Sequence, residues 1–355
     1  MRLCVVGCGA MSSSVHGPSY LQYRAAHEDF VPAACCDLNP GAARRYAERF
    51  GFARFYTGAD EMFDQEKPDA VCVIVSESAA AGVGERALLR GLPLLMEKPP
   101  GKNAGETRRL RAAAEKTGAP NMTAFNRRFM PVMREGKRQV ELSGRPVRQI
   151  NYSLYRVGRN DEDFSDTAIH AIDAVRFLAR SDYREARFTR RDISGFRPQN
   201  VILEAVMESG ALARITVLPV SGAGIERAEV HCEGCSVFIA LPLNEPGIDG
   251  AGSVTVYTDG KAAAHYEGLE LCGNAEPWIT GGFYQENADF FDALRGGTLG
   301  RGAFHDALNT MEVKDAYADG TEIWRRGEDF SDRASAYKKF VKIDIKEEWE
   351  GKRNE

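Results

Sequence analysis

The sequence has 355 residues, with 46 lysines and arginines against 51 aspartates and glutamates, a formal net charge of −5. At about 150 residues per domain, this length predicts about two domains. The composition, with 43% hydrophobic and 27% charged residues, excludes wholesale disorder and fibrous repeats. The mildly acidic balance argues against a nucleic-acid binder. Because apolar runs of about 18 residues and a signal-peptide pattern are both absent, we expect a cytoplasmic protein that does not bind membranes.

The first 125 residues alternate between strand-like and helix-like segments. The predicted strands cover residues 3–6, 31–36, 52–56, 70–75, 92–96 and 121–125, and the predicted helices cover 11–24, 40–50, 59–65, 79–90 and 104–117. Strands that alternate with helices form βαβ units, so this part predicts a parallel sheet with helices on both faces. The continuous apolar run Val71–Val75 is typical of a strand buried on both faces.

The pattern changes after about residue 125. Longer alternating runs predict strands at 147–155, 186–193, 200–207, 211–218, 228–240 and 253–257, and helices are expected at 127–142, 167–178, 283–294 and 303–319. Strict alternation favours a largely antiparallel sheet with one solvated face. The residues after Gly327 are rich in charge and predict a solvated extension. We therefore divide the chain into domains at 1–125 and 126–325, followed by a polar extension at 326–355.

A glycine-rich turn, Gly7-Cys8-Gly9-Ala10-Met11-Ser12, follows the first predicted strand and opens the first predicted helix. The first glycine permits the tight turn, and the second lets the backbone approach a pyrophosphate. The helix N-terminus then offers free N–H groups to the phosphates. Ser12 replaces the usual third glycine or alanine, a small departure. The alternative is an ordinary strand–helix turn, but the flanking elements favour a nucleotide site.

Asp37 ends the second predicted strand, 28 residues after Gly9. A carboxylate at this position accepts both ribose hydroxyls and repels the 2′-phosphate of NADP, so NAD is favoured. The usual spacing is about 20 residues, and we expect a loop at 24–29 to absorb the excess. Two alternatives stay open: Asp37 as the cap of the next helix, and use of NADP through Arg44 and Arg45.

Two further motifs carry candidate catalytic groups. Glu97-Lys98-Pro99-Pro100 closes the fifth predicted strand, at the sheet edge where ligands of such folds bind. There the Lys98 ammonium can stabilise a developing alkoxide. Asp166 and His170 stand four residues apart on a predicted helix, so the carboxylate can orient an imidazole that accepts a proton; Asp173 can share that face. The remaining histidines have no such partner pattern and are expected to be structural: His16, His27, His231, His265 and His305.

Two weaker patterns have competing readings. Cys232-Glu233-Gly234-Cys235 has the spacing of a zinc half-site, but no second pair accompanies it and Gly234 suits a hairpin turn. We therefore expect no metal. Four arginines, Arg127, Arg128, Arg156 and Arg159, can bind an acidic group of a substrate or can simply be solvated.

These motifs occur in a fixed order: the glycine turn, Asp37, Glu97-Lys98-Pro99, the Asp166–His170 pair, and the segment Phe283–Leu294. In this order, over about residues 1–320, the chain resembles the Gfo/Idh/MocA family of glucose–fructose oxidoreductase, inositol dehydrogenase and rhizopine catabolism proteins. The resemblance implies an N-terminal Rossmann domain with a doubly wound parallel sheet. It also implies a C-terminal α+β domain whose large, open, mostly antiparallel sheet supports a homo-oligomer, a dimer or tetramer.

The resemblance also implies residue roles. Lys98, Asp166 and His170 match the catalytic set, and the stretch 124–129 matches a segment that lines the nicotinamide end of the cleft. The residues that match cofactor-binding positions are Gly7, Gly9, Ala10, Met11, Asp37, Ser76, Glu97, Lys98 and Asn126. The chain departs from the family at 75–80, which lacks the usual proline and histidine, and at 162–165, which lacks the usual glycines. No member's substrate is therefore transferred.

The sequence thus predicts an NAD(P)-dependent enzyme that moves a hydride between nicotinamide and a secondary alcohol of a sugar, polyol or related compound. Lys98 and His170 would act on the reacting oxygen and Asp166 would orient His170. One alternative is a redox-cycling glycosidase or lyase of the same family, which regenerates NAD in place. Another is a non-catalytic nucleotide sensor, which the retention of Lys98, Asp166 and His170 argues against.

Overall fold

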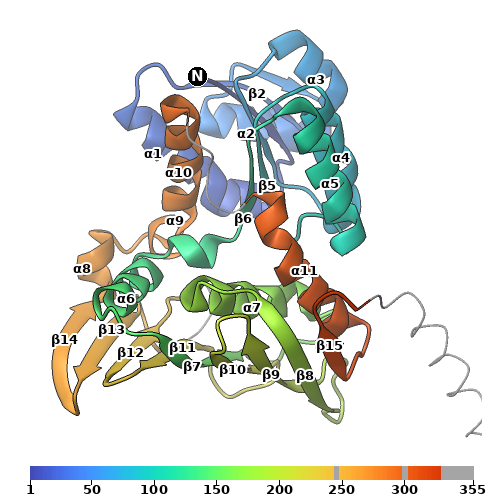
Figure 1. The fold of residues 1–355 in the computed structure, drawn as a ribbon. Helices are drawn as coiled ribbons and strands as arrows, with labels where there is room; N and C mark the ends of the chain where they lie inside the picture. The colour runs from blue at the N-terminus through green and yellow to red at the C-terminus, as the bar shows by residue number, and fades with distance from the viewer. Residues whose placement is uncertain (244–247, 298–302, 329–355) are drawn as a thin grey trace, which may run out of the picture.

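The computed structural model describes residues 1–243, 248–297 and 303–328, and it places two sheets one above the other (Figure 1). The first sheet belongs to the N-terminal part of the chain and the second to the C-terminal part. From residue 329 onward, the charged extension expected from the sequence lies outside the described residues. The mixed α/β class predicted from the sequence is confirmed.

The first sheet is parallel throughout and has the strand order β3-β2-β1-β4-β5-β6. Its strands are β1 (Arg2–Val6), β2 (Val31–Cys36), β3 (Arg54–Tyr56), β4 (Ala70–Val73), β5 (Leu94–Glu97) and β6 (Asn121–Ala124). The helices between them are η1 (Ser12–His16) with α1 (Gly17–Ala26), α2 (Pro40–Phe50), α3 (Ala59–Glu66), α4 (Glu77–Leu89) and α5 (Ala104–Thr117). Since the order reverses between β1 and β4, the carboxyl edge at these strands is where this fold binds its ligands.

Side chains of the central strands divide between the two faces of this sheet with the period of two that a strand imposes. Leu3 and Val5 join a core with side chains of α1 and α2, whereas Cys4 and Val6 join a core with α3, α4 and α5. Both faces are therefore covered, which is why these strands read as continuous apolar runs.

The long spacing from Gly9 to Asp37 has a different cause from the expected loop. The helix after the glycine turn opens with a π-helical segment, η1, and α1 then continues to Ala26. A π-turn accommodates one extra residue within a helix, and the helix continues to Ala26, so only residues 27–30 connect it to β2.

The second sheet has nine strands in the order β14-β13-β12-β11-β7-β10-β9-β8-β15. Its members are β7 (Val147–Tyr155), β8 (Tyr183–Arg191), β9 (Asn200–Met207), β10 (Leu212–Leu218), β11 (Ile225–Cys232), β12 (Cys235–Ala240), β13 (Ser253–Thr258), β14 (Lys261–Glu267) and β15 (Ile323–Arg325). Only the central β7–β10 pair is parallel, so the predicted mostly antiparallel sheet is confirmed. The predicted strand at 228–240 is a hairpin that turns at Gly234, where φ is +63°.

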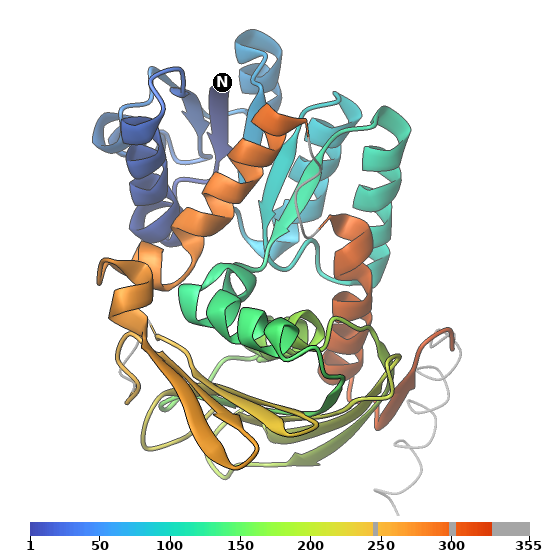
Figure 2. The same ribbon diagram turned by 60° about the vertical axis from the view of Figure 1, so that its left-hand side comes forward.

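One face of this sheet carries the core of the second domain. Helices α6 (Pro131–Leu142) and α7 (Ser165–Ala179) pack on it, and Figure 2 shows them between the two sheets. The helix predicted at 127–142 is divided: η2 (Asn126–Phe129) ends before an extended Met130, and α6 begins at Pro131. The physical reason is that a proline disfavours the helical conformation of the residue before it.

Two late helices connect the domains. Helix α10 (Phe283–Gly296) packs along α1 (Figure 2), and its Phe290 and Phe291 join the core of the first sheet. Helix α11 (Phe304–Ala318) packs on both α5 and α7. The segment 126–325 is therefore not one spatial unit, because α10 returns to the N-terminal domain. The short helices α8 (Gly268–Cys272) and α9 (Pro277–Thr280) precede α10.

Within residues 1–243, 248–297 and 303–328, no helix has the length and apolar character needed to cross a bilayer. All eight cysteines are free thiols, and seven of them are buried. Cys232 and Cys235 face each other across the β11–β12 hairpin and belong to the core of the second domain.

Candidate active site

The glycine turn has a backbone that only glycine supports. Gly7 has a φ of +99°, and a Cβ at this residue would lie 1.9 Å from the carbonyl oxygen of Ile74. At Gly9, by contrast, a Cβ would meet no atom of the described part of the chain within 4 Å, so that backbone faces open space there. A turn that is tight at its first glycine and open at its second, followed directly by a helix N-terminus, fits a pyrophosphate. The fully buried Ser12 occupies the third position.

Asp37 lies against this turn at the end of β2. Its Oδ2 accepts a hydrogen bond from the N–H of Cys8 at 2.9 Å, and its Oδ1 accepts one from the N–H of Asn39 at 2.8 Å. The carboxylate remains partly exposed. The cap of α2 is Asn39, whose side chain accepts from Gly41 and Ala42. The alternative in which Asp37 caps this helix is therefore excluded, and its partly exposed carboxylate lies beside the glycine turn.

Lys98 follows the last residue of β5, and its ammonium crosses to the second domain. Nζ donates a hydrogen bond to the backbone carbonyl of Asp166 at 2.9 Å. Burial lowers the pKa of Lys98 below its ordinary value, while the carboxylates of Glu97 and Asp166 oppose the shift. The Lys98–Pro99 peptide bond is cis. The hydrogen bond to Asp166 thus links Lys98 to the second domain. The residue itself directly follows β5, at the carboxyl edge of the first sheet.

Glu97 links Lys98 to a histidine that the sequence assigned a purely structural role. One carboxylate oxygen of Glu97 accepts from the Lys98 N–H at 3.0 Å, and the other lies 2.9 Å from Nε2 of His16. The amide of Asn287 on α10 donates to Nδ1 of the same ring at 3.1 Å. Because Nδ1 accepts, Nε2 carries the proton that His16 donates to Glu97. His16, with 1% of its surface exposed, therefore fixes the carboxylate of Glu97, which in turn holds the backbone N–H of Lys98.

His170 lies on α7 with 9% of its surface exposed. Its Nε2 is 3.4 Å from Nη1 of Arg127. Burial and the positive charges of Arg127, Lys98 and Arg156 hold the pKa of His170 well below its usual range. The imidazole is therefore neutral near pH 7 and retains a lone pair that can accept a proton.

The expected contact between Asp166 and His170 is not made in this structure. Among the residues that the structure describes, Nδ1 of His170 is buried without a hydrogen-bond partner, and Oδ1 of Asp166 lies 3.8 Å from Nζ of Lys314. Asp166 stands in the first turn of α7, where the helix dipole and Lys314 both attract a carboxylate. The i, i+4 spacing placed the two residues on neighbouring turns but did not fix where the carboxylate points.

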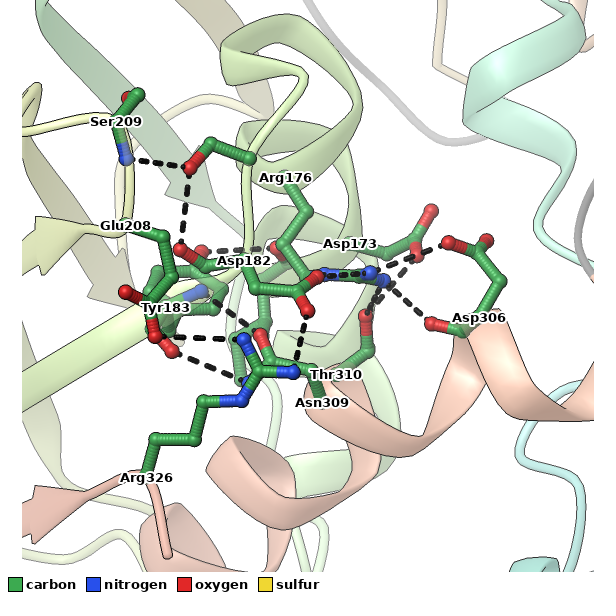
Figure 3. A network of polar contacts seen from close by, with 12 residues as sticks. Asp173, Arg176, Asp182, Tyr183, Glu208, Ser209, Asp306, Asn309, Thr310 and Arg326 are labelled. Carbon is green, nitrogen blue, oxygen red and sulfur yellow. Dashed lines mark hydrogen bonds and ion pairs between the residues drawn. The ribbon is translucent and has the colours of Figure 1, made fainter.

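Asp173, which shares the helix with His170, belongs to another polar network. It accepts from Nε and Nη2 of Arg128 at 2.7 and 2.6 Å and from the hydroxyl of Thr310 at 3.2 Å. Figure 3 shows the adjoining contacts of Asp173, Thr310 and Asp306, among them the hydrogen bond that Arg176 donates to Asp306. Arg128 donates to Asp306 as well, at 2.5 Å. Arg128 is thus used in holding α7 and α11 together and is not part of the site.

A cavity of about 610 Å³ brings most of the predicted residues together. It is lined by residues of the glycine turn and of both domains: Gly9, Ala10, Met11, Ser12, Ile74, Val75, Glu97, Lys98, Asn126, Arg127, Met130, Arg156, Arg159, Thr167, His170, Pro242, Leu243 and Phe283. Four predicted residues are outside this lining: Gly7, Asp37, Ser76 and Asp166. Gly7 and Asp37 adjoin it through Cys8 and Gly9. Ser76 lies at the start of α4 with its hydroxyl 3.1 Å from that of Ser78.

Comparison with known proteins identifies the family that the N-terminal part of the chain resembles. Residues 1–125 match the family model GFO_IDH_MocA, described as "Oxidoreductase family, NAD-binding Rossmann fold". The chain is 26% identical over 180 residues to D-apiose dehydrogenase of Paraburkholderia graminis, covering 47% of this chain and 48% of that protein. It is 29% identical over 347 residues to rhizopine catabolism protein MocA of Rhizobium meliloti, covering 92% and 95%. The chain spans about half the length of the curated relatives it matches first.

A solved oxidoreductase from Agrobacterium radiobacter, crystallised with NAD+, L-tartaric acid and magnesium, shares the fold. Its TM-score is 0.77 at 17% sequence identity, with 92% of this chain and 98% of that chain covered. The similarity extends over both domains, so the arrangement of a parallel sheet above an open mixed sheet is a shared architecture. The predicted Rossmann fold is confirmed, and the family resemblance is confirmed over residues 1–125, whose family model is described as NAD-binding.

Proposed function

From the match of residues 1–125 to the Gfo/Idh/MocA oxidoreductase family model, we propose that the protein is an NAD-dependent dehydrogenase of a sugar or polyol. The observation that carries the proposal is the single cavity that joins the open glycine turn to Lys98 and His170. Bound NAD supplies a nicotinamide carbon that accepts or returns a hydride. The glycine turn and the helix after it would hold the pyrophosphate, and Asp37 the adenosine ribose.

His170 is the proposed base. A neutral imidazole accepts the proton of the substrate hydroxyl, and burial together with the neighbouring cations keeps His170 neutral. Lys98 places an ammonium in the same cavity, where it stabilises the negative charge that develops on the deprotonated oxygen. The proposal thus gives the two groups complementary tasks: one removes the proton and the other stabilises what remains.

The proposed role of Asp166 differs from the one expected from the sequence. Its backbone carbonyl accepts from Lys98 Nζ, so Asp166 would position the lysine rather than the imidazole. The 3.4 Å contact of Arg127 Nη1 with Nε2 of His170 uses the lone pair that would accept the hydroxyl proton, so the substrate oxygen would replace Arg127 at Nε2. Asn126 would complete the lining of the cavity. Its side-chain amide donates to the carbonyl of Gly281, which fixes its orientation.

The test is production of NADH by the purified protein from NAD+ and a panel of sugars, polyols and their derivatives. Net NADH formation that depends on a secondary alcohol supports the proposal. Conversion of a glycoside without accumulation of NADH would instead support the redox-cycling hydrolase or lyase. Binding of NADH with no conversion of any alcohol would contradict both reactions and support a nucleotide sensor.

The exposed face of the second sheet supports a further part of the proposal, a homo-oligomer. Burial alternates along its strands, and large apolar side chains remain exposed on three of them, at Leu212, Phe238 and Tyr257. A face of this kind suits a second copy of the chain. Light scattering of the purified protein gives its mass directly, and a monomer at micromolar concentration would contradict the assembly.

A further inference from the structure

A buried lysine on α11, Lys314, lies between the two domains. Only 2% of its surface is exposed. Its Nζ donates to the carbonyl oxygen of Lys102 at 2.9 Å and to Oε1 of Glu77 at 3.2 Å, and it lies 3.8 Å from Oδ1 of Asp166. An ammonium has three N–H donors and no acceptor, and burying it is costly unless it is paired. One carbonyl and two carboxylates supply that pairing.

Each of the three partners belongs to a segment next to the cavity. Lys102 lies in the loop between β5 and α5, and this loop begins with Lys98. Glu77 is the first residue of α4, after β4, and Asp166 lies in the first turn of α7. Lys314 therefore connects two segments at the carboxyl edge of the first sheet to a helix of the second domain.

Neighbouring residues of α11 contact the same region. Oδ2 of Asp315 accepts a hydrogen bond from the N–H of Ala104 at 2.8 Å, at the start of α5. Met311, about one turn before Lys314, belongs to a small buried apolar cluster drawn from both domains: Ala104, Phe125, Ile169, Ala307 and Met311. The loop that begins with Lys98 thus has a defined place relative to α7.

The contacts of Lys314 also reach the ammonium of Lys98. Nζ of Lys98 donates to the backbone carbonyl of Asp166, and the carboxylate of the same residue faces Lys314. The carboxylates of Asp166 and Glu77 both favour the charged form of Lys98 and oppose the lowering of its pKa by burial. Lys314 pairs with these two carboxylates, although it lies outside the cavity lining.

We propose that Lys314 is a positioning residue for Lys98: it joins the loop after Lys98 to the first turn of α7, and so fixes the Lys98 ammonium in the cavity that it shares with His170. This inference rests on the proposed dehydrogenase function and adds a residue to the same site. The competing explanation is that Lys314 contributes to stability alone, as a buried ion pair between helices can.

The first experiment compares two buried polar residues of α11. Lys314→Met keeps the length of the side chain and removes its charge. Thr310→Val, about one turn earlier, removes hydrogen bonds with Arg176 and Asp173. Because a displacement of about 1 Å can cost about a hundredfold in rate, we expect Lys314→Met to lower kcat by about ten- to a hundredfold, with the KM for the alcohol and the Kd for NADH close to wild type.

The control variant Thr310→Val should lower Tm and leave kcat near the wild-type value, because its contacts do not reach the loop after Lys98. Equal losses of kcat in Lys314→Met and Thr310→Val would assign Lys314 to stability alone and overturn the proposal.

The pH profile is a readout that a purely structural role would not move. In Lys314→Met the carboxylates of Glu77 and Asp166 lose a counter-ion, and unpaired negative charge favours the ammonium form of Lys98. His170, across the cavity, is neutral in the alkaline range. The alkaline limb of kcat/KM should therefore move to higher pH, and an unchanged limb would contradict the proposed contact with the surroundings of Lys98.

Glu77→Gln is a milder variant that keeps the proposal testable if Lys314→Met does not fold, since the Glu77 side chain is 28% exposed. It removes a negative charge that favours the Lys98 ammonium, so the alkaline limb should move to lower pH, and kcat should fall because Lys314 loses a partner. The other charges that act on Lys98, those of Glu97 and Arg127, are unchanged. Wild-type kcat with an unchanged limb would overturn the proposal.

A crystal structure of Lys314→Met separates this inference from the proposed function. If the wild-type protein converts no alcohol, the dehydrogenase proposal fails, but the position of Lys98 can still be compared between variant and wild type. We expect loss of the hydrogen bond from Lys98 Nζ to the carbonyl of Asp166, with displacement of the loop 98–103. A hydrogen bond that persists, with the loop in place, would overturn the positioning role whether or not the protein is active.

Discussion

The two ends of the cavity are built in opposite ways. At the glycine turn, the binding surface is backbone, and its essential residues lie within a few positions of one another along β1 and the start of η1. At the other end, which Arg127, Arg156 and Arg159 line, the surface is made of side chains joined over long distances in sequence, such as Arg127 to Glu226, 99 residues apart. A surface made of backbone can be recognised from a short motif, whereas a surface made of charged side chains from distant parts of the chain depends on the whole fold.

The largest expected effects concern the two groups proposed to act on the reacting oxygen. Lys98→Ala and His170→Asn should each lower kcat/KM by about 10²- to 10⁴-fold, because each removes a proton acceptor or a charge that acts in the transition state. NADH should still bind. The exposed Lys116→Ala on α5 and His265→Asn on β14 are the controls. Near-normal turnover in Lys98→Ala or His170→Asn would remove that residue from the mechanism.

The glycine turn offers a comparison within one motif. Gly7→Ala places a methyl group on the carbonyl of Ile74 in a strained backbone, so it should lower the free energy of unfolding by about 3 kcal/mol. In Gly9→Ala the added methyl group meets no described atom within 4 Å, so the free energy of unfolding should not change. The methyl group would, however, occupy the space expected for the pyrophosphate. Chemical denaturation and fluorescence titration with NADH measure the two effects. A Gly9→Ala protein with unchanged NADH affinity would argue against pyrophosphate binding at the glycine turn.

Asp37 tests the choice of cofactor. Replacing it by serine removes the acceptor of the ribose hydroxyls and the charge that repels a 2′-phosphate, and Arg44 and Arg45 are close in sequence. We expect the preference for NAD over NADP to fall by about ten- to a hundredfold, the range for losing a hydrogen bond to a charged group. The ratio of kcat/KM for the two cofactors measures this change. A wild-type protein that already prefers NADP would contradict the assigned role.

The smallest expected effect is on the pH profile. Since neighbouring cations and burial lower the pKa of His170, the neutral base persists below pH 6.5, and kcat/KM for oxidation should fall only at lower pH. Since burial also lowers the pKa of Lys98, activity that needs the ammonium should fall as pH rises, before pH 10.5. Arg127→Gln removes one cation and should move the acid limb upward. An acid limb at or above pH 6.5 in the wild-type protein would contradict a depressed histidine pKa.

Local signals predicted most of the first domain. The helices at 40–50 and 104–117 and the strand at 31–36 have the predicted bounds, because proline, asparagine and glycine mark the ends of these elements within a few residues. Gly118 illustrates this, since it ends α5 in the left-handed conformation at a φ of +71°. The break before Pro131 could also have been found from the proline alone.

The site itself was only partly predictable. Spacing brought Asp166 and His170 to one helix, but the carboxylate turns toward Lys314, which lies far along the chain on α11. His16 was missed because its partner Glu97 is 81 residues away, and no local pattern signals that contact. Arg127 and Arg128 are neighbours with opposite roles: one lines the cavity, while the other is bound to Asp173 and Asp306. The two side chains point to different surroundings because successive residues of the helical turn η2 face different directions.

The central claim is that an amine from one domain and an imidazole from the other meet at a single alcohol oxygen. A crystal structure of the protein with NADH and its best substrate tests this most directly. The account predicts that one hydroxyl oxygen of the substrate lies within hydrogen-bond distance of both Lys98 Nζ and a ring nitrogen of His170. A substrate whose reacting hydroxyl contacts neither group, while it occupies the cavity beside the cofactor, would contradict the account.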